Sequence, residues 1–387
     1  MMDTFPGYER ADGTVGIRNH VAIVPSVSCA NGVVANIAKA VPEAIPLFHG
    51  NGCGRGGIDV EVHNRTLQNI CKNPNIAAVL IVGLGCEFVS AEGMSMVSSF
   101  AGRPQAKLMI QEEGGSRETE KKGIEIVRGF LEDVKKLEPK QFPMEKLIIG
   151  LECGGSDAFS GVTANPAVGV ASDWFVDAGA TVILTETTEM IGTSHILEKR
   201  AADPETAEKI KAIIAKTEQK THEVLGPLAK VVIAPGNMDG GLSSIQEKAL
   251  GCIIKAGTRA IQQVVDYAEV PAKKGVVVMD GPGYDTESMT GLAAGGAQII
   301  LFTTGRGNPI GFPVVPVVKI ASNSRLYKNM PDDMDVNAGE ILEGKSLEQK
   351  GNEIRDLILR VANGDQTCAE QNGQNGIMCV YTQTTAF

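Results

Sequence analysis

The chain has 387 residues, 43% of them hydrophobic, and a formal net charge of −10. This length predicts two or three domains with sizeable cores, and an acidic chain without any basic run is a poor candidate for nucleic-acid binding. The sequence has no N-terminal hydrophobic signal and no apolar stretch long enough to span a bilayer, so we expect a cytoplasmic protein that does not bind membranes. Its eight cysteines then suit a metal, a cluster or catalysis better than disulfides.

Strand-like and helix-like runs alternate along the whole chain. Many strand-like runs are continuously apolar, which indicates strands buried on both faces, as in parallel sheets. Strands are predicted near residues 19–25, 44–48, 77–82, 107–111, 146–150, 181–185, 231–234, 275–279, 298–302 and 315–320. Helices are predicted at 31–41, 115–137 and 203–225. The fold class is therefore α/β, with mostly parallel, Rossmann-like sheets.

The charged, proline-containing segment 133–146 predicts a domain boundary. We expect an N-terminal α/β domain over residues 1–141 and a larger C-terminal α/β domain over 142–387. The polar tail 363–387 is weakly strand-like at its end, and we expect it to form an edge strand or a subunit contact.

Three cysteines each follow a strand-like run, and a fourth lies in the glycine-rich segment HGNGCGRGG. Ligands of α/β sheets gather outside the carboxyl ends of the strands, so these thiols predict one shared metal site. Thiolates are soft ligands for iron, zinc or iron–sulfur clusters. The predicted metal ligands are Cys29, Cys53, Cys86, Cys153, His49 and Glu87. The alternative for any one of them is a buried cysteine that acts as a small hydrophobe. We adopt that interpretation for Cys71, Cys252, Cys368 and Cys379.

The segment LECGGSDAFSGVTANP, residues 151–166, is a glycine-rich turn between a strand and a helix. Backbone N–H groups of such a turn can bind an anion. The predicted substrate-binding residues here are Gly154, Gly155, Ser156 and Asp157. The alternative is a turn with a structural role only.

Two further loops carry candidate catalytic groups. Arg306 lies between two glycines after a strand, where its guanidinium can form two hydrogen bonds with a substrate carboxylate. Acid–base candidates also follow strands, because carboxylates, phenols and imidazoles can transfer protons there. They are Glu186, His195, Tyr284 and Asp285. A solvated loop arginine and a structural histidine are the alternatives.

The segments GYERADGTVGIRN, IVGLGCE, QEEGGSRET, ECGGSDAFSGVTANPAVG, DGPGYD and FTTGRG occur in this order over nearly the whole chain. In these segments the chain resembles the altronate/galactarate dehydratase family. The resemblance implies a hydro-lyase of carbohydrate acid metabolism that uses a divalent metal on a small hydroxy-acid substrate. That metal is usually iron, as Fe²⁺ or an iron–sulfur cluster, with Mn²⁺ as an alternative.

Single-chain members of the family begin with a small extra domain, whereas this chain starts at GYERADGTVGIRN. The resemblance therefore implies the large catalytic subunit of a split enzyme, with a small second subunit that carries that domain, in a homo-oligomer. The expected reaction converts an altronate-like 2,3-dihydroxy acid into a 2-keto-3-deoxy acid. The alternative within the family is the large subunit of a sulfolactate sulfo-lyase, which releases sulfite. A non-catalytic ligand-binding module and a purely structural subunit are the alternatives outside it.

Overall fold

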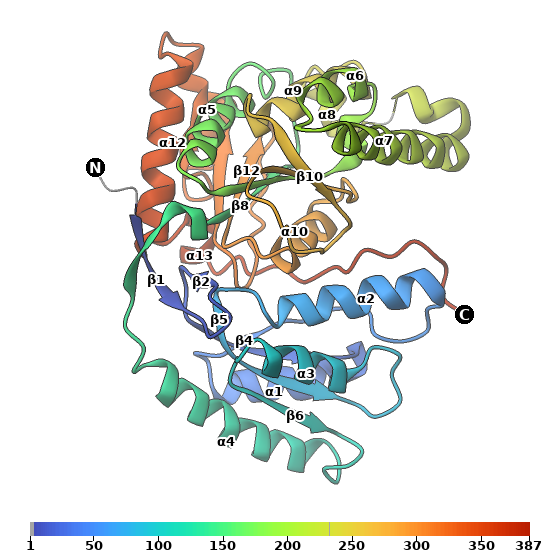
Figure 1. Cartoon of the computed structure of the whole chain (residues 1–387), viewed down its shortest axis with the longest axis vertical. Helices are drawn as coiled ribbons and strands as arrows, with labels where there is room; N and C mark the ends of the chain where they lie inside the picture. Colours follow the sequence, from blue (N-terminus) through green and yellow to red (C-terminus); the bar gives the residue numbers. More distant parts are fainter. Residues whose placement is uncertain (1–3, 232) are drawn as a thin grey trace.

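The computed structural model describes residues 4–231 and 233–387, and these residues form two parallel sheets and one small antiparallel sheet (Figure 1). Parallel strands joined by helices confirm the predicted α/β class. Among the described residues, no helix combines the length and the hydrophobicity that a membrane span requires.

The smaller parallel sheet has the strand order β4-β3-β5-β6. Its strands are β3 (His20–Pro25), β4 (Ile45–Pro46), β5 (Ile76–Gly83) and β6 (Gln105–Met109). Every residue of β5 is buried, because helices cover both faces of the sheet. One face packs against α1 (Asn31–Ala40) and α4 (Ser116–Val134), and the other against α2 (Gly57–Ile70) and α3 (Ala91–Phe100).

The larger parallel sheet has the strand order β10-β11-β9-β8-β12-β13-β14. Its strands are β8 (Ile148–Cys153), β9 (Thr181–Leu184), β10 (Ile261–Val265), β11 (Gly275–Met279), β12 (Ile299–Thr304), β13 (Val317–Ala321) and β14 (Val336–Asn337). The strand that follows β8 in the chain lies on one side of it, and β12 lies on the other. In open α/β sheets such a reversal opens a crevice at the carboxyl ends of the strands, where ligands bind.

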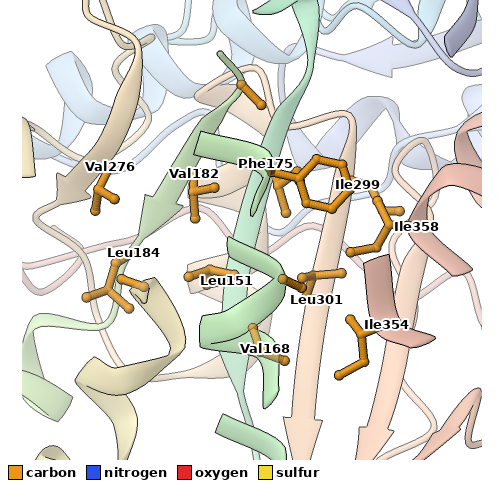
Figure 2. Packing of buried hydrophobic residues seen from close by; sticks show 14 of the residues in the cluster. Leu151, Val168, Phe175, Val182, Leu184, Val276, Ile299, Leu301, Ile354 and Ile358 are labelled. Atoms are coloured by element: carbon orange, nitrogen blue, oxygen red, sulfur yellow. The ribbon is translucent and has the colours of Figure 1, made fainter. Parts of the chain in front are cut away.

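Helices cover both faces of the larger sheet. Figure 2 shows Ile299 of β12 beside the ring of Phe175 of α5 (Ala164–Asp177), in the same buried cluster as Ile354 of α12 (Leu347–Ala362). On the opposite face, α10 (Asp285–Ala294) packs against α2, which lies between the two sheets (Figure 1). One apolar cluster therefore runs from the smaller sheet through α2 and α10 to the larger sheet.

The antiparallel sheet joins β1 (Thr4–Glu9), β2 (Val15–Gly16) and β7 (Lys140–Pro143). Strand β7 lies in the segment that we expected to be a domain boundary, and it pairs with β1. The division at residue 141 stays a prediction. The remaining helices are α6 (Ser194–Leu197), α7 (Pro204–Leu225), α8 (Pro235–Asp239), α9 (Ile245–Cys252), α11 (Ser324–Asn329) and α13 (Cys368–Gln371).

The predicted strand at 231–234 is wrong for the residues that the structure describes. A 3-10 helix spans Gly226–Val231, α8 starts at Pro235, and residue 232 lies outside the described residues. The proline favours the first turn of a helix and ends the short apolar run before it can pair. Strand β10, which was not predicted, is an edge strand whose partly exposed middle hides the apolar pattern.

The C-terminal tail forms no strand among its described residues, contrary to one of our two expectations. It extends along α2, with Met378 and Val380 buried in the cluster between the sheets (Figure 1). Backbone N–H groups of Gln383 and Thr384 donate to the carboxylate of Asp59, at 2.8 and 2.9 Å. The tail thus reaches the glycine-rich segment that holds Cys53.

Candidate active site

The glycine turn after β8 contacts the loop after β12. The carbonyl oxygen of Gly155 accepts hydrogen bonds from the N–H groups of Gly305 (3.0 Å) and Arg306 (2.8 Å). Gly155 has a φ of +65°, a left-handed conformation that favours glycine. The structure therefore brings Arg306, whose side chain is exposed, next to the predicted anion-binding turn.

Asp285 lies at the same place, at the start of α10. A side chain at Gly154 would collide with the Asp285 carboxylate and the Phe302 ring, so only glycine allows this close approach. The Asp285 carboxylate accepts a hydrogen bond from the Asn308 side chain at 2.7 Å, and it is half-buried. Tyr284, the preceding residue, is 60% exposed. The loops after β8, β11 and β12 thus converge, as the strand-end rule predicts.

Asp157 has a structural role, which differs from our prediction of substrate binding. One of its carboxylate oxygens accepts from the backbone and hydroxyl of Ser160 and from the hydroxyl of Ser322, and the other accepts from Asn323. These four donors saturate the buried carboxylate and hold the loop after β8 against the loop after β13. The neighbouring Ser156 is also buried, with its Oγ 3.3 Å from the Cys153 sulfur.

Glu186 is fully buried, with an unusual backbone conformation for a non-glycine residue, φ 68° and ψ 64°. Such strain persists only where the surroundings enforce it, and it concentrates at functional sites. Its Oε2 accepts from the Cys153 N–H at 3.0 Å. His195, by contrast, is exposed on α6, and its ring forms no hydrogen bond with the described residues, so the structure does not bring it into this group.

Three acids converge beneath the glycine turn. One carboxylate oxygen from each of Glu152, Glu186 and Asp285 lies within 4.8 Å of the others. Burial, and then repulsion from Asp285, raises the pKa of Glu152, and burial and repulsion from Glu152 raise that of Glu186. The Oε1 atoms of both glutamates are buried without a hydrogen-bond partner among the described residues. The group can therefore hold a proton or bind a cation through oxygen.

Two lysines neutralise the buried acids. Lys255 is 1% exposed, and its Nζ lies 3.3 Å from Glu186 Oε2 and 3.7 Å from Glu189 Oε2. Lys248 of α9 forms an ion pair with the other oxygen of Glu189. Burial alone would lower the pKa of Lys255, but the charges of Cys153 and Glu186 raise it well above its usual value. Lys255 is therefore protonated in the folded protein.

Cys153 lies in this cluster and not with the other predicted thiol ligands. Its sulfur is 2.8 Å from Glu189 Oε2 and 3.3 Å from the sulfur of Cys252. Cys252 was interpreted as structural, and its position here corrects that interpretation. A cavity of about 240 Å³ adjoins the pair and is lined by Ser156, Asn165, Lys248 and Cys252 among others.

Sequence reasoning missed the lysines and Cys252 because they belong to α9 and the 3-10 helix Ile253–Ala256, not to strand ends. From the sequence, this cluster was indicated by Cys153 at a strand end and by the two acids of the segment TETTEM.

Lys319 on β13 is a further buried amine that the sequence did not reveal. Its Nζ lies 3.5 Å from the centroid of the Phe302 ring and has no hydrogen-bond partner among the described residues. Burial lowers the pKa of Lys319 to about 7, although the carboxylates of Asp285 and Glu152 oppose this shift. Lys319 is thus a base that can change its charge near neutral pH.

Replacing Lys319 with Met should stabilise the fold near neutral pH. The pKa of Lys319 is about 7 in the folded protein and 10.5 as the ordinary value, so the unfolded chain binds the proton more tightly. The free-energy cost of burying the protonated lysine is greatest below pH 7 and decreases as the pH rises. The variant's advantage in unfolding free energy over the wild type should therefore shrink by up to about 1.4 kcal/mol for each pH unit above pH 7.

Urea unfolding of both proteins from pH 7 to 10 measures this difference. Lys350→Met is the matched control, because Lys350 is equally buried but paired with Glu340 at 2.7 Å and with Glu353. The control should be less stable than the wild type. Parallel pH profiles for the wild type and Lys319→Met would show that Lys319 carries its ordinary charge.

The other three predicted thiol ligands lie at the carboxyl ends of the smaller sheet. Cys29, Cys53 and Cys86 are free and exposed. Hydrogen bonds join the loops that carry them: the Ser28 N–H donates to Asn51 O at 2.9 Å, and the Phe88 N–H donates to Gly52 O at 3.1 Å. No three candidate ligand atoms of these loops lie within 4.8 Å of one another, among the residues described.

Glu87 and His49 support these loops and are not free to bind a metal as predicted. Glu87 accepts from the N–H groups of Gly85 (2.7 Å) and Cys86 (2.9 Å) and from the Ser26 hydroxyl. Partial burial would raise the pKa of Glu87, but these hydrogen bonds lower it. His49 Nε2 lies 2.7 Å from Pro25 O, and its Nδ1 accepts from the Asn51 N–H at 3.1 Å. Both ring nitrogens of His49 are therefore occupied.

Two family descriptions match almost the whole chain. The C-terminal domain of D-galactarate/altronate dehydratase matches residues 144–385, and the second domain of D-galactarate dehydratase/altronate hydrolase matches residues 7–135.

Curated relatives match over similar lengths. Altronate dehydratase of Bacillus subtilis is 36% identical over 95% of this chain and 76% of its own length. Galactarate dehydratase (L-threo-forming) of Escherichia coli is 35% identical over 98% of this chain and 76% of its own length. The (2R)-sulfolactate sulfo-lyase subunit beta of Chromohalobacter salexigens is 33% identical over 96% of this chain and 95% of its own length.

Proposed function

The chain belongs to the D-galactarate/altronate dehydratase family, and on this premise we propose that it is a lyase that removes water from a sugar acid with hydroxyl groups on C2 and C3. The observation that carries the proposal is the convergence of Arg306, the Gly155 turn and Asp285 above a buried group of acids and lysines. The elimination of water from a hydroxy acid needs a group that binds the carboxylate and, next to it, groups that take up and release protons.

The reaction breaks the C2–H and C3–O bonds of the substrate. A base takes the C2 proton, the C3 hydroxyl leaves as water with a proton from an acid, and the enol becomes a 2-keto-3-deoxy acid. Arg306 binds the carboxylate, which withdraws charge from C2. Asp285 is half-buried at the mouth, and burial raises its pKa, so it can exchange protons with the substrate and with Glu152 below it. Tyr284 is the second candidate acid, and His195 is dropped.

Iron is part of the proposal. Cys29, Cys53 and Cys86 would hold it, because three exposed thiols on joined loops form a soft donor set. When bound, an iron–sulfur cluster with an open position supplies a Lewis acid for a substrate oxygen. Mn²⁺ is a harder ion and would prefer carboxylate oxygens, such as those of Glu152 and Asp285.

The proposal includes an assembly. The thiol loops and the acid–lysine cluster lie at the ends of different sheets, and no hydrogen bond or ion pair between described residues links them. A small second subunit and a second copy of this chain would enclose the two sites and exclude water. Support comes from the relative that is itself named a subunit and that this chain matches over 95% of its length.

That same match favours one second candidate, a sulfo-lyase that releases sulfite from a sulfolactate. This elimination has the same form as the dehydration, except that the sulfonate group leaves as sulfite where the hydroxyl group would leave as water. The test offers altronate, galactarate and sulfolactate to anaerobically purified protein supplied with iron, and measures keto-acid and sulfite formation. Binding is followed separately as a rise in the midpoint of thermal unfolding, which does not require turnover. The proposal fails if no acid is bound or converted.

Arg306→Lys should lower kcat/KM by roughly ten- to a hundredfold without changing the fold. Lysine keeps the charge but loses the planar pair of donors, and a charge-assisted hydrogen bond contributes about 1.5–3 kcal/mol. Steady-state kinetics with the acid that is converted best give the ratio. Arg325→Lys is a control in another exposed segment, on α11. If Arg306→Lys stays within about twofold of wild type, the Gly155 turn holds the carboxylate without Arg306.

A further inference from the structure

Cys153 and Cys252 form an isolated pair of thiols inside the larger sheet's cluster. Cys153 ends β8 and Cys252 ends α9, and both are free and almost completely buried. Their sulfur atoms are 3.3 Å apart. A disulfide needs a sulfur–sulfur distance of about 2.0 Å, so a small movement of either side chain would close the bond.

The two sulfur atoms lie close enough to react with each other. The Cys153 thiol donates a hydrogen bond to the Glu189 carboxylate at 2.8 Å, and the ammonium groups of Lys255 and Lys248 lie beside the same carboxylate. Because the two sulfurs are 3.3 Å apart, an oxidised sulfur of either residue meets the thiol of the other.

A small oxidant can reach Cys252 through the cavity of about 240 Å³. Cys252 lines this cavity together with Val162 and Leu250, which are 55% and 48% exposed, so the cavity wall continues to the surface. The volume exceeds that of a hydroperoxide group and a few water molecules, each of which occupies about 30 Å³ in the liquid.

A soft metal ion is the competing occupant, since Cys153, Cys252 and Glu189 present ligand atoms within 4.8 Å. The charge balance argues against it. The Glu189 carboxylate accepts a hydrogen bond from the Cys153 thiol and already pairs with both Lys248 and Lys255. A divalent ion would add two positive charges beside two buried ammonium groups, which is unfavourable at low dielectric.

We propose that Cys153 and Cys252 are a redox-modification site that a hydroperoxide converts reversibly into a disulfide. The thiolate of one cysteine attacks the peroxide, the O–O bond breaks, and the leaving oxygen takes a proton to become an alcohol or water. The resulting sulfenic acid reacts with the thiol of the other cysteine, which forms the S–S bond and releases water. A dithiol reductant restores both thiols. The inference does not depend on the dehydratase reaction.

Peptide mass mapping of the whole, folded chain tests this inference. The protein is treated with hydrogen peroxide, the excess is removed with catalase, and free thiols are alkylated before digestion. We expect one cross-linked peptide pair that contains Cys153 and Cys252, has lost two hydrogens, and disappears after dithiothreitol. In Cys252→Ser, the cross-link should vanish, and sulfenic-acid labelling of Cys153 should rise several-fold over wild type. Cys71→Ser, at a buried apolar site, is the control and should keep the cross-link.

Two results would overturn the inference. The first is wild-type protein in which Cys153 and Cys252 stay reduced while the exposed Cys29, Cys53 and Cys86 are oxidised. The second is a metal ion, bound with unit stoichiometry in wild type and lost in Cys252→Ser, that protects both thiols. The wild-type mapping decides the matter even if Cys252→Ser folds poorly.

Discussion

Replacing Cys53 with Ser is expected to remove iron and catalytic activity together. Cys53 lies on the middle one of the three joined loops, so in the proposed iron site its thiolate would be a ligand together with those of Cys29 and Cys86. A serine hydroxyl is a hard and weakly acidic ligand that replaces a soft thiolate poorly. Loss of a supporting group alone costs about ten- to a hundredfold in metal affinity, so loss of a ligand should cost at least about a hundredfold.

The measurements are iron content and the visible absorption of anaerobically purified protein, followed by the assay of acid conversion. Cys379→Ser is the matched control, because Cys379 is a half-buried free cysteine of the tail whose N–H donates to the Thr290 hydroxyl of α10 at 3.2 Å. It should keep both iron and activity. Wild-type iron content in a Cys29, Cys53 and Cys86 triple Ser variant would contradict the thiol centre. Iron that disappears without loss of activity would separate the metal from the reaction.

Lys255→Met is expected to destabilise the fold by about 3–5 kcal/mol, because it leaves buried carboxylates without their counter-charge. Lys255 is 1% exposed and lies between Glu186 and Glu189. Methionine has a similar length, so the loss of charge dominates over the loss of packing. The midpoint of urea unfolding should fall accordingly, without a change in the slope of the transition.

A second substitution separates charge from packing. Glu189→Gln removes the charge that faces Lys255 at 3.7 Å, so the double variant should recover part of the lost stability. Lys216→Met is the control for an exposed lysine, since its ion pair with Asp280 should contribute less than about 1 kcal/mol. If Lys255→Met unfolds at the urea concentration of the wild type, Lys255 is not the charge that balances the cluster.

The parallel sheets were predictable from the sequence because a strand that is buried on both faces is apolar at nearly every position. Strands β5 and β11 read as unbroken apolar runs, and an unbroken run is what a covered parallel strand requires. Helix α7 was also predictable, since Asp203 and Pro204 are a cap and a first turn, and the Asp203 side chain accepts from the Thr206 N–H. Strand β10 has no unbroken apolar run, because an edge strand can contain polar residues as well as apolar ones.

The convergence of Gly155, Asp285 and Arg306 could also be predicted from the sequence. Parallel strands place their carboxyl ends at one edge of a sheet, so residues that follow such strands are expected to meet there. The rule also placed Cys153 at a strand end. It could not say which sheet each strand joined, and Cys153 proved to belong to the larger sheet, whereas Cys53 and Cys86 belong to the loops of the smaller one.

The buried cluster was decided by tertiary structure alone. Lys248, Cys252 and Lys255 come about a hundred residues after Cys153, on a helix and a 3-10 turn, and local sequence patterns do not encode which strand end a helix will cover. The role of His49 was decided in the same way. Its place beside the cysteine loop suggested a ligand, but ring orientation and backbone partners occupy both nitrogens. The sequence by itself determined the fold class, the family and the strand ends where function gathers. Long-range packing decided which charges balance one another, because charge balance depends on distances that only the folded chain sets.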